Sequence, residues 1–240
     1  MVLPEQIEAS IQALERAGFA AWLVGGCVRD SLMGITPHDY DLCTAALPEQ
    51  TSTVFRHIPQ DFTGIKHGTV KLLAPGGEIE ITTFRREGDY RDNRHPDWVA
   101  FVPDVREDLA RRDFTVNAIA WSPTRGFADP FGGIEDLKAG VLRCVGEPET
   151  RFREDALRIL RGVRFAVRYG MTVEEKTFAA MVELRHLLDA LSRERVFAEL
   201  CGILPLSAAA QPTPPSTSPS MPPSVSALRC GALLLTRRAM

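Results

Sequence analysis

The sequence is poor in the features that mark secreted, disulfide-bonded or membrane-spanning proteins. Its 240 residues contain only five cysteines, and none of them is spaced as CxxC: Cys27, Cys43, Cys144, Cys201 and Cys230. No run approaches the ~20 apolar residues that a membrane span needs, and the first ten residues lack the apolar core of a signal peptide. These absences argue against a zinc site and a disulfide framework, so we expect a soluble cytoplasmic protein with reduced thiols.

Acidic residues are missing from the C-terminal end of the chain. No Asp or Glu follows Glu199, and residues 205–226 hold seven of the 17 prolines among many Ser, Thr and Ala residues. Such a composition cannot bury a hydrophobic core. We therefore predict that residues 205–240 form a disordered tail.

The rest of the chain has the residue balance of an ordinary globular protein, with 45% hydrophobic and 25% charged residues. The net charge of −3 does not by itself indicate nucleic acid. The arginines are nevertheless clustered, because six of them lie within one short segment: Arg151, Arg153, Arg158, Arg161, Arg164 and Arg168. A local basic stripe can bind phosphates whatever the total charge.

Hydrophobic patterning divides the chain into a mixed α/β part and a helical part. In the first part we predict helices over 5–17, 28–32, 48–57 and 134–139, and strands over 19–24, 39–42, 69–73 and 78–84. The segment Pro75-Gly76-Gly77 indicates a hairpin between the last two strands. Residues 85–96 are charged and poor in apolar side chains, which predicts a mobile loop. The pattern becomes helical from about Glu149, so we place a head domain at 1–145 and a helical neck at 146–204.

Two carboxylates lie two residues apart at Asp39 and Asp41. Alternate residues of a strand point to the same face, and carboxylates are preferred ligands of Mg²⁺. Glu80, in the last predicted strand, is a candidate third carboxylate, although Glu78 shares its face. The pattern alone is weak evidence, because a solvated surface turn often carries the same residues.

Three further groups of residues suggest nucleotide binding. Gly25 and Gly26 follow a predicted strand, where backbone N–H groups can approach a phosphate, and Arg29 lies one turn into the next helix. The segment Arg111-Arg112-Asp113 offers guanidinium groups for phosphates, and Asn117 can bond a ribose or a base. A tight connection and a surface charge cluster are the simpler interpretations of these two groups.

The third group lies in the helical part, where Glu154-Asp155-x-x-Arg158 places an acid and a base one helical turn apart. Such a pair can address the Watson–Crick edge of a base, or it can form an ordinary salt bridge between Asp155 and Arg158. Arg158, Arg161 and Arg164 repeat every three residues, so they lie near one helix face. An anion bound there would relieve their mutual repulsion.

Together these segments resemble the class II tRNA nucleotidyltransferases (CCA-adding enzymes) and the bacterial poly(A) polymerases. Seven segments match that family's motifs in the same order, over roughly residues 1–200: 23–30, 37–42, 80–85, 90–96, 111–118, 129–133 and 154–158 with Arg161 and Arg164. The resemblance implies an α/β head of the DNA polymerase β nucleotidyltransferase type, with a mixed sheet and flanking helices, followed by an all-α neck.

The resemblance also implies a role for each matching residue. Asp39 and Asp41 would hold Mg²⁺ in a two-metal site, with Glu80 as a third catalytic carboxylate. The incoming nucleotide would be bound in the head by Gly25, Gly26, Arg29, Arg111, Arg112, Asp113 and Asn117. In the neck, Asp155 and Arg158 would pair with C or A as a protein template, supported by Arg161 and Arg164. Residues 85–96 match the family's flexible loop, which is linked to the switch from C to A addition.

The implied function is template-independent addition of CCA to tRNA 3′ ends from CTP and ATP, with release of pyrophosphate. We expect the protein to bind no membrane and to need no obligatory protein partner. The family continues into further helical domains that grip tRNA, whereas here the matching pattern stops after Cys201. Three hypotheses therefore remain: a CCA-adding enzyme or a CC- or A-adding specialist, a poly(A) polymerase, and a nucleotide- or RNA-binding remnant with little activity.

Overall fold

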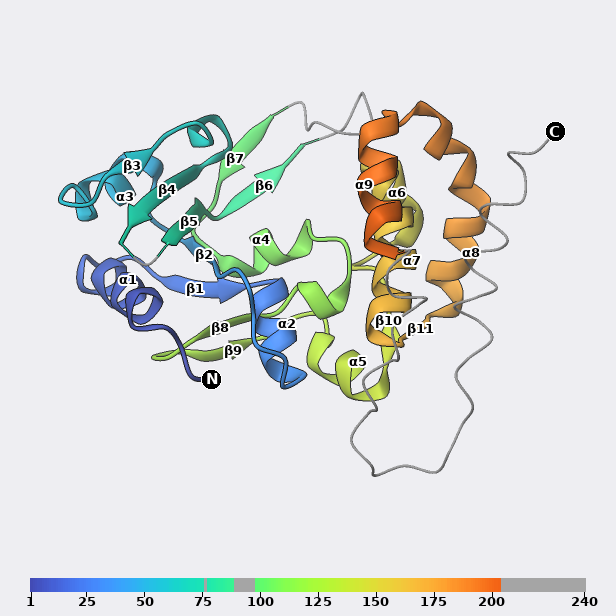
Figure 1. The fold of residues 1–240 in the computed structure, drawn as a ribbon, viewed down its shortest axis with the longest axis horizontal. Coiled ribbons are helices and arrows are strands. Elements are labelled where there is room, and N and C mark those ends of the chain that lie inside the picture. Colours follow the sequence, from blue (N-terminus) through green and yellow to red (C-terminus); the bar gives the residue numbers. More distant parts are fainter. Residues whose placement is uncertain (76, 89–97, 204–240) are drawn as a thin grey trace. The chain divides into compact units, whose positions relative to one another are not determined.

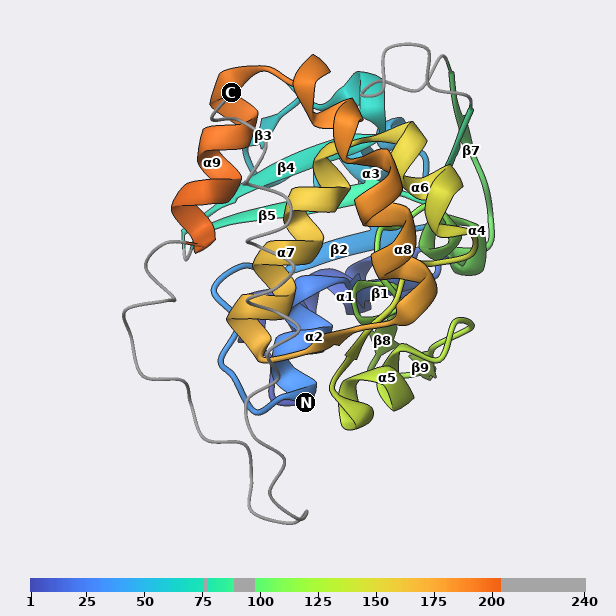
Figure 2. The ribbon, with the colours of Figure 1, turned by 90° about the vertical axis from the view of Figure 1, so that its right-hand side faces the viewer.

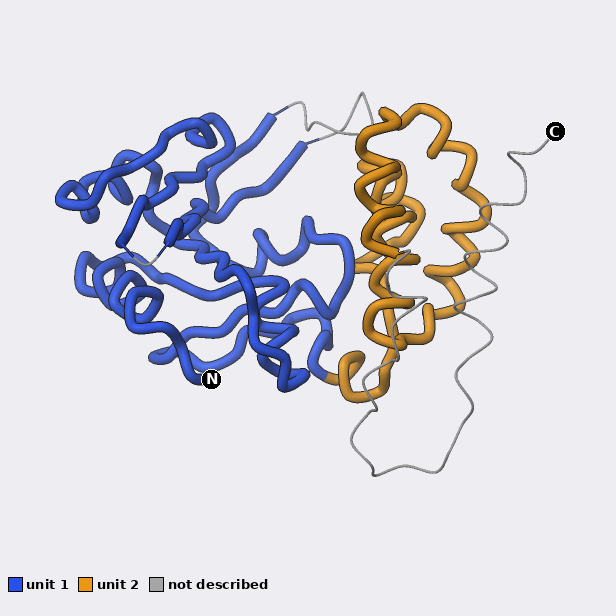
Figure 3. The backbone as a smooth tube through the Cα atoms, in the orientation of Figure 1, with its two compact units in different colours: residues 1–89, 96–134 blue, residues 90–95, 135–240 orange. Residues whose placement is uncertain are grey.

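The computed structural model describes residues 1–75, 77–88 and 98–203. The chain divides into two compact units, one of residues 1–89 and 96–134 and the other of residues 90–95 and 135–240 (Figure 3). This division falls between Ile134 and Glu135. The predicted domain limits at 145 and 204 remain predictions, and the predicted tail at 205–240 lies outside the described residues.

The first unit is built on a seven-stranded sheet with the order β3-β4-β5-β2-β1-β8-β9 (Figure 1). Its strands are β1 (Ala21–Val24), β2 (Asp41–Thr44), β3 (Gln60–Asp61), β4 (Thr69–Ala74), β5 (Gly77–Thr83), β8 (Ala120–Ser122) and β9 (Gly126–Ala128). The pair β2–β5 is parallel and the other pairs are antiparallel, so the sheet is mixed. The hairpin predicted around residues 75–77 is confirmed, because β4 and β5 pair from Thr69–Thr82 to Ala74–Gly77.

Short helices accompany this sheet. They are α1 (Glu5–Arg16), α2 (Gly26–Leu32), α3 (Pro48–Val54) and α4 (Val105–Ala110), with 3-10 turns η1 (Ile65–His67) and η2 (Thr115–Asn117). Helix α5 (Gly133–Ala139) begins at the end of the first unit and lies mostly in the second. The first helix forms where the sequence predicts it, because Ile7, Ile11 and Leu14 recur on one face and are buried. The core around the sheet includes Leu23, Leu42 and Ile81, which are almost completely excluded from solvent.

A separate two-stranded ribbon, β6 (Arg85–Glu87) with β7 (Val99–Phe101), corrects the prediction of a mobile loop that starts at residue 85. Residues 85–87 pair in register with residues 99–101, a partner that lies too far along the chain for local patterning to reveal. The rest of the predicted loop, residues 89–96, lies outside the described residues.

The second unit is mainly helical, with α6 (Pro148–Glu154), α7 (Leu157–Tyr169), α8 (Glu175–Glu183), the 3-10 segment η3 (Leu184–Ala190) and α9 (Arg193–Ile203). Helices α7 and α9 pack side by side (Figure 2). A short parallel pair, β10 (Val141–Leu142) with β11 (Thr172–Val173), joins the segments on either side of α6 and α7. Among the described residues, no helix is both long enough and apolar enough to span a membrane.

The continuous helix expected from about residue 149 is interrupted at Asp155 and Ala156. Asp155 has extended backbone angles, with φ −143° and ψ 104°, so it ends α6 rather than lying inside a helix. Its side chain accepts a hydrogen bond of 3.0 Å from the N–H of Leu157 at the start of α7. An aspartate that caps its own downstream helix competes with helix continuation, which explains the break.

Candidate functional site

The paired aspartates lie at the beginning of β2, a strand at the centre of the sheet. Strand β2 starts at Asp41, so Asp39 precedes the strand and the prediction of a strand over 39–42 places its start two residues too early. Both aspartates are exposed, whereas the next three residues of β2 are buried. The buried residues of β2 therefore hold the strand in the sheet, and the two carboxylates lie at its exposed end.

Negative charge accumulates around Asp41. Its Cα is the register partner of Glu80 on the parallel strand β5. The pKa of Asp41 is raised, first by loss of hydration and then by the charges of Glu80 and Asp39, while Arg112 opposes the shift. Crowded carboxylates of this kind suit a divalent cation, whose charge would relieve the repulsion.

Glu80 has a competing partner. Lys71 on β4 lies 3.2 Å from its carboxylate and 2.8 Å from that of Glu78. Within the described residues, no three His, Cys, Asp or Glu side chains gather as a complete metal cluster. Metal binding by Asp39 and Asp41, and the role of Glu80 as a third carboxylate, therefore stay predictions.

The glycine pair forms the turn between β1 and α2. Gly25 has φ +73°, and a Cβ atom at this position would lie only 2.7 Å from Nη1 of Arg112. Glycine is therefore required both by the backbone conformation and by the approach of a guanidinium group. Gly26 is the first residue of α2, and its added Cβ would lie 3.5 Å from Nη2 of Arg29.

Arg29 and Asn117, which are 88 positions apart in the sequence, are in direct contact. Arg29 is buried, donates to the side-chain oxygen of Asn117 and forms an ion pair of 2.7 Å with Asp30. The amide nitrogen of Asn117 in turn donates to Asp113 over 3.1 Å. The structure thus joins three residues predicted to bind nucleotide, and it uses many of their polar atoms to hold one another.

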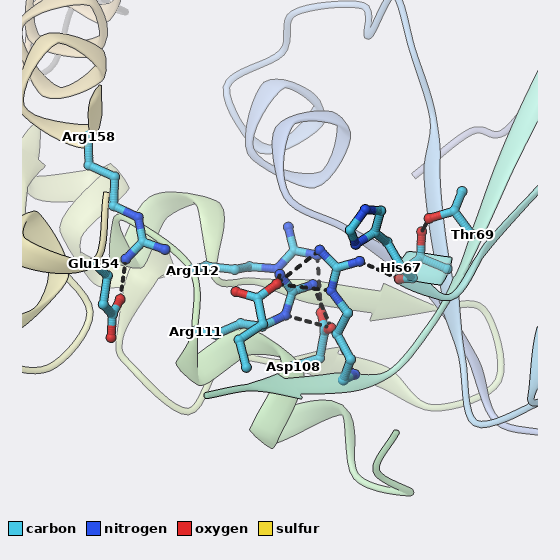
Figure 4. A network of polar contacts seen from close by, with 10 residues as sticks. His67, Thr69, Asp108, Arg111, Arg112, Glu154 and Arg158 are labelled. Atoms are coloured by element: carbon cyan, nitrogen blue, oxygen red, sulfur yellow. Dashed lines mark hydrogen bonds and ion pairs between the residues drawn. The ribbon is translucent and has the colours of Figure 1, made fainter. Parts of the chain in front are cut away.

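A cavity of about 210 Å³ opens beside Asp41. Its wall carries three guanidinium groups and two threonine hydroxyls, contributed by Arg85, Arg111, Arg112, Thr69 and Thr82. Asp108 from α4 also reaches this wall, and Figure 4 shows Arg111 and Arg112 converging on its carboxylate. A cavity lined by cationic donors next to a pair of carboxylates has the chemistry to bind a phosphorylated ligand together with a metal ion.

Sequence reasoning missed Asp108, Glu87 and Arg85, which organise this cavity. Asp108 forms ion pairs with Arg111 over 2.8 Å and with Arg112 over 3.2 Å. Glu87 forms ion pairs of 2.9 Å with both Arg85 and Arg111. The spacing of Asp108 three and four residues before the arginines was a usable signal, whereas the contribution of Glu87 depends on the β6–β7 ribbon.

In the second unit, the acid and base predicted to form one pair have different partners. Arg158 donates to Glu154 over 2.6 Å, and Figure 4 shows this contact. Asp155 forms its ion pair with Arg195 of α9 over 3.0 Å. The suggested salt bridge between Asp155 and Arg158 is therefore wrong, because the break between α6 and α7 turns the Asp155 side chain towards α9.

The three evenly spaced arginines of α7 also have partners that balance their positive charge. Arg164 forms an ion pair of 2.6 Å with Glu199 of α9. Arg161 and Arg164 both lie over the ring of Phe165, at 5.2 and 4.6 Å from its centre. Glu154 and Glu199 thus already supply negative charge to this face, and the binding of a further anion there stays a prediction.

Comparison with known families shows to which of them the chain belongs. A family model described as "Poly A polymerase head domain" matches residues 21–143. The chain belongs to this family. A second model, described as "Probable RNA and SrmB- binding site of polymerase A", matches residues 170–211. The predicted resemblance and the predicted mixed-sheet fold are confirmed.

Relatives of the poly(A) polymerase head family show how far the similarity extends. The CCA-adding enzyme of Streptococcus thermophilus (strain CNRZ 1066) is 47% identical over 205 residues, which cover 84% of this chain and 50% of that protein. The crystal structure of the Bacillus stearothermophilus CCA-adding enzyme in complex with CTP matches with a TM-score of 0.77 and 41% identity, covering 86% of this chain and 51% of that one. The Thermotoga maritima CCA-adding enzyme complexed with tRNA matches with a TM-score of 0.72 and 26% identity, covering 97% and 52%. This chain therefore spans about half the length of the relatives it matches.

Proposed function

We propose that this chain is a template-independent nucleotidyltransferase that adds C and A residues to the 3′ end of tRNA from CTP and ATP and releases pyrophosphate. The observation that carries the proposal is the cavity beside Asp41, whose wall combines the guanidinium groups of Arg111 and Arg112 with the neighbouring pair of carboxylates. A relative that is 47% identical to this chain over 205 residues, half of its own length, is a CCA-adding enzyme, which supports the choice of reaction.

The proposed metal site uses Asp39 and Asp41 as ligands for Mg²⁺, with Glu80 as a third carboxylate nearby. When bound, the metal ions would help to ionise the attacking hydroxyl and neutralise charge on the leaving pyrophosphate. The two aspartates suit this task because they are exposed and crowded by like charge. Their own contribution is to fix the position of the reacting phosphate.

The proposed nucleotide site surrounds the triphosphate and the sugar. Gly25 and Gly26 keep the backbone close to the phosphates, and Arg112 offers donors across the Gly25 turn. Arg29, Arg111, Asp113 and Asn117 complete this set. Asn117 is hydrogen-bonded to Arg29 and to Asp113, and Arg111 to Asp108 and Glu87. These bonds hold the donors in place before the substrate arrives, which lowers the ordering cost of binding.

In the proposed reaction, the 3′ oxygen of the RNA bonds to the α-phosphorus of the nucleotide. The bond from that phosphorus to its bridging oxygen breaks in line, and pyrophosphate leaves. Residues of the chain act by orientation and by charge, as is typical of phosphoryl and nucleotidyl transfer.

The choice of base is assigned to the second unit. We propose that Asp155 and Arg158 face the Watson–Crick edge of C or A, and that Arg161 and Arg164 support them through Phe165 and Glu199. On this proposal residues 1–145 form the catalytic head and 146–204 the nucleotide- and RNA-binding neck.

The test is an incorporation assay with purified protein, Mg²⁺ and a tRNA that lacks its 3′ CCA. The tRNA is offered labelled CTP alone, ATP alone, and then both. We expect two C additions from CTP and a final A when ATP is present. Absence of any addition, with CTP binding intact, would contradict the proposed activity and favour a nucleotide-binding protein.

Polyadenylation is the second candidate, and the match of residues 21–143 to the poly(A) polymerase head domain favours it. The same assay separates the two activities. A long ladder of A residues from ATP alone would identify a poly(A) polymerase, whereas termination after CCA would exclude it.

A further inference from the structure

We propose that Asp108 is the positioning residue of the nucleotide site, holding Arg111 and Arg112 in the geometry that receives the triphosphate. The inference rests on the proposed nucleotide site, and it assigns a role to a residue that contacts no substrate in that scheme. Asp108 lines the same cavity but is buried, so it acts through the arginines with which it pairs.

The contacts of Asp108 come from two separate segments of the first unit. One carboxylate oxygen accepts from Nε and Nη2 of Arg111, at 3.1 and 2.8 Å, and from the backbone N–H of Arg85, at 3.2 Å. The other oxygen accepts from Nη2 of Arg112 at 3.2 Å. A single carboxylate therefore ties the end of α4 to the first residue of the β6–β7 ribbon.

Burying the charged carboxylate of Asp108 costs desolvation free energy unless ion pairs and hydrogen bonds compensate for it. The residue has no exposed surface. Burial alone would raise its pKa, but Arg111, Arg112 and the hydrogen bonds outweigh this and keep the pKa of Asp108 below its ordinary value. A buried, ionised carboxylate with several charged donors fixes side-chain directions, because any rotation of a donor exposes an unpaired charge.

The two arginines held by Asp108 differ in how many contacts they make. Arg111 also donates to Glu87 over 2.9 Å, so both ends of its guanidinium are fixed by carboxylates. Arg112 pairs with Asp108, and its buried Nε has no hydrogen-bond partner among the described residues. Arg112 is thus held at fewer points than Arg111, and its Nη1 lies at the Gly25 turn beside the cavity, while Arg111 serves as a support.

Loss of Asp108 should therefore weaken phosphate binding more than it slows the chemical step. Without its carboxylate, Arg112 loses its ion pair and can swing away from the cavity. Glu87 can still hold Arg85 and Arg111, which predicts a smaller effect when Glu87 is changed.

The experiment compares Asp108→Asn, Glu87→Gln and the wild-type chain by equilibrium binding of CTP and of inorganic tripolyphosphate, each with Mg²⁺. For Asp108→Asn we expect binding of both anions to weaken about tenfold, as for loss of a hydrogen bond to a charged group. For Glu87→Gln we expect about threefold weakening. Where wild-type incorporation is measurable, KM for CTP should rise more than kcat falls.

The matched control is Asp136→Asn, since Asp136 of the second unit is also buried and pairs with Arg143 over 3.1 Å. It should lower thermal stability without changing the affinity for tripolyphosphate. Unchanged anion binding in folded Asp108→Asn, or equal weakening in Asp136→Asn, would overturn the proposal. If Asp108→Asn does not fold, the comparison of Glu87→Gln with Asp136→Asn decides it. If the wild-type chain binds CTP but adds no nucleotide, the proposed function fails while the binding comparison still tests Asp108.

Discussion

The two units differ in how their arginines are paired with carboxylates. In the first unit the carboxylates lie behind the arginines, since the side chains of Asp108 and Glu87 are only 1% and 7% exposed, and the guanidinium groups face the cavity. In the second unit Asp155 and Arg158, the residues proposed to read the base, are each bonded to another charged side chain. In both arrangements the arginines are paired with carboxylates. In the first they also line a cavity that a ligand can enter, whereas in the second the groups proposed to read the base would have to exchange partners.

This difference predicts two kinds of binding. A triphosphate that enters the cavity adds interactions to arginines that buried carboxylates continue to hold, so it gains affinity. A base that contacts Asp155 and Arg158 exchanges existing hydrogen bonds for new ones, and the net gain of such an exchange is small. The same exchange discriminates strongly, because a mismatched base leaves polar groups unpaired.

The largest expected effect is in the head. Asp41→Asn should reduce nucleotide incorporation about a thousandfold, since several kcal/mol of transition-state stabilisation depend on a metal ligand. The measurement is single-turnover addition of C to a tRNA lacking CCA. Thermal unfolding serves as the control, and it should show no loss of stability because Asp41 is exposed. Incorporation within tenfold of wild type would rule out Asp41 as a metal ligand.

The second prediction tests the approach of Arg112 to the glycine turn. Gly25→Ala should raise the KM for CTP about tenfold, because the new Cβ would lie 2.7 Å from Nη1 of Arg112 and displace it. Gly18→Ala is the matched control, since Gly18 has φ +89° and open space around its Cβ position. Both variants should lose about 1–2 kcal/mol of stability from the left-handed backbone conformation, but only Gly25→Ala should lose CTP affinity. Equal KM values in the two variants would contradict a role for this close approach.

The third prediction addresses the paired arrangement of the second unit. Arg195→Gln removes the ion pair of Asp155, so among the described residues only the N–H of Leu157 still restricts the direction of its carboxylate. We expect discrimination of CTP and ATP against UTP and GTP to fall about fivefold, with little change in overall incorporation of the correct nucleotides. Arg193→Gln, on the same helix and exposed, should leave selectivity unchanged. Unaltered selectivity in Arg195→Gln would mean that this ion pair does not orient a base-reading carboxylate.

The smallest expected effect concerns pH. The pKa of Asp41 is raised in the folded state, so its contribution to stability is present below the unfolded pKa and is lost as pH rises through the folded pKa. The Asp41→Asn variant has no titrating carboxyl group at this position, so it does not lose this stability as the pH rises. The variant should therefore gain stability relative to wild type on going from acid to neutral pH, by less than about 1 kcal/mol for an exposed charge. Chemical denaturation at several pH values measures the difference, and a gain in the opposite direction would contradict the crowding by Asp39 and Glu80.

Strands β1, β2, β4 and β5 of the sheet could be predicted from sequence, as could helices α1, α2, α3 and α5, because each is marked by local patterning. Strands β3, β8 and β9 and helix α4 were not predicted. The apolar face of α1, the hairpin between β4 and β5 and the glycine turn before α2 all follow from residues a few positions apart. The exceptions have physical causes that lie outside the local segment. Strand β6 forms because residues 99–101 pair with it, and α6 ends because Asp155 bonds the N–H of Leu157 and pairs with Arg195.

The sequence by itself determined which groups are available, namely two closely spaced aspartates, a glycine turn and arginine-rich segments arranged in the order of a known family. Only the tertiary structure decided how these groups share their charges. It extended the local contact of Asp108 with Arg111 and Arg112 to Arg85 of the β6–β7 ribbon, and it placed Glu199 beside Arg164 of α7 and Arg195 beside Asp155. Charge pairing depends on distances of a few ångströms between segments far apart in the chain, and no local pattern encodes those distances.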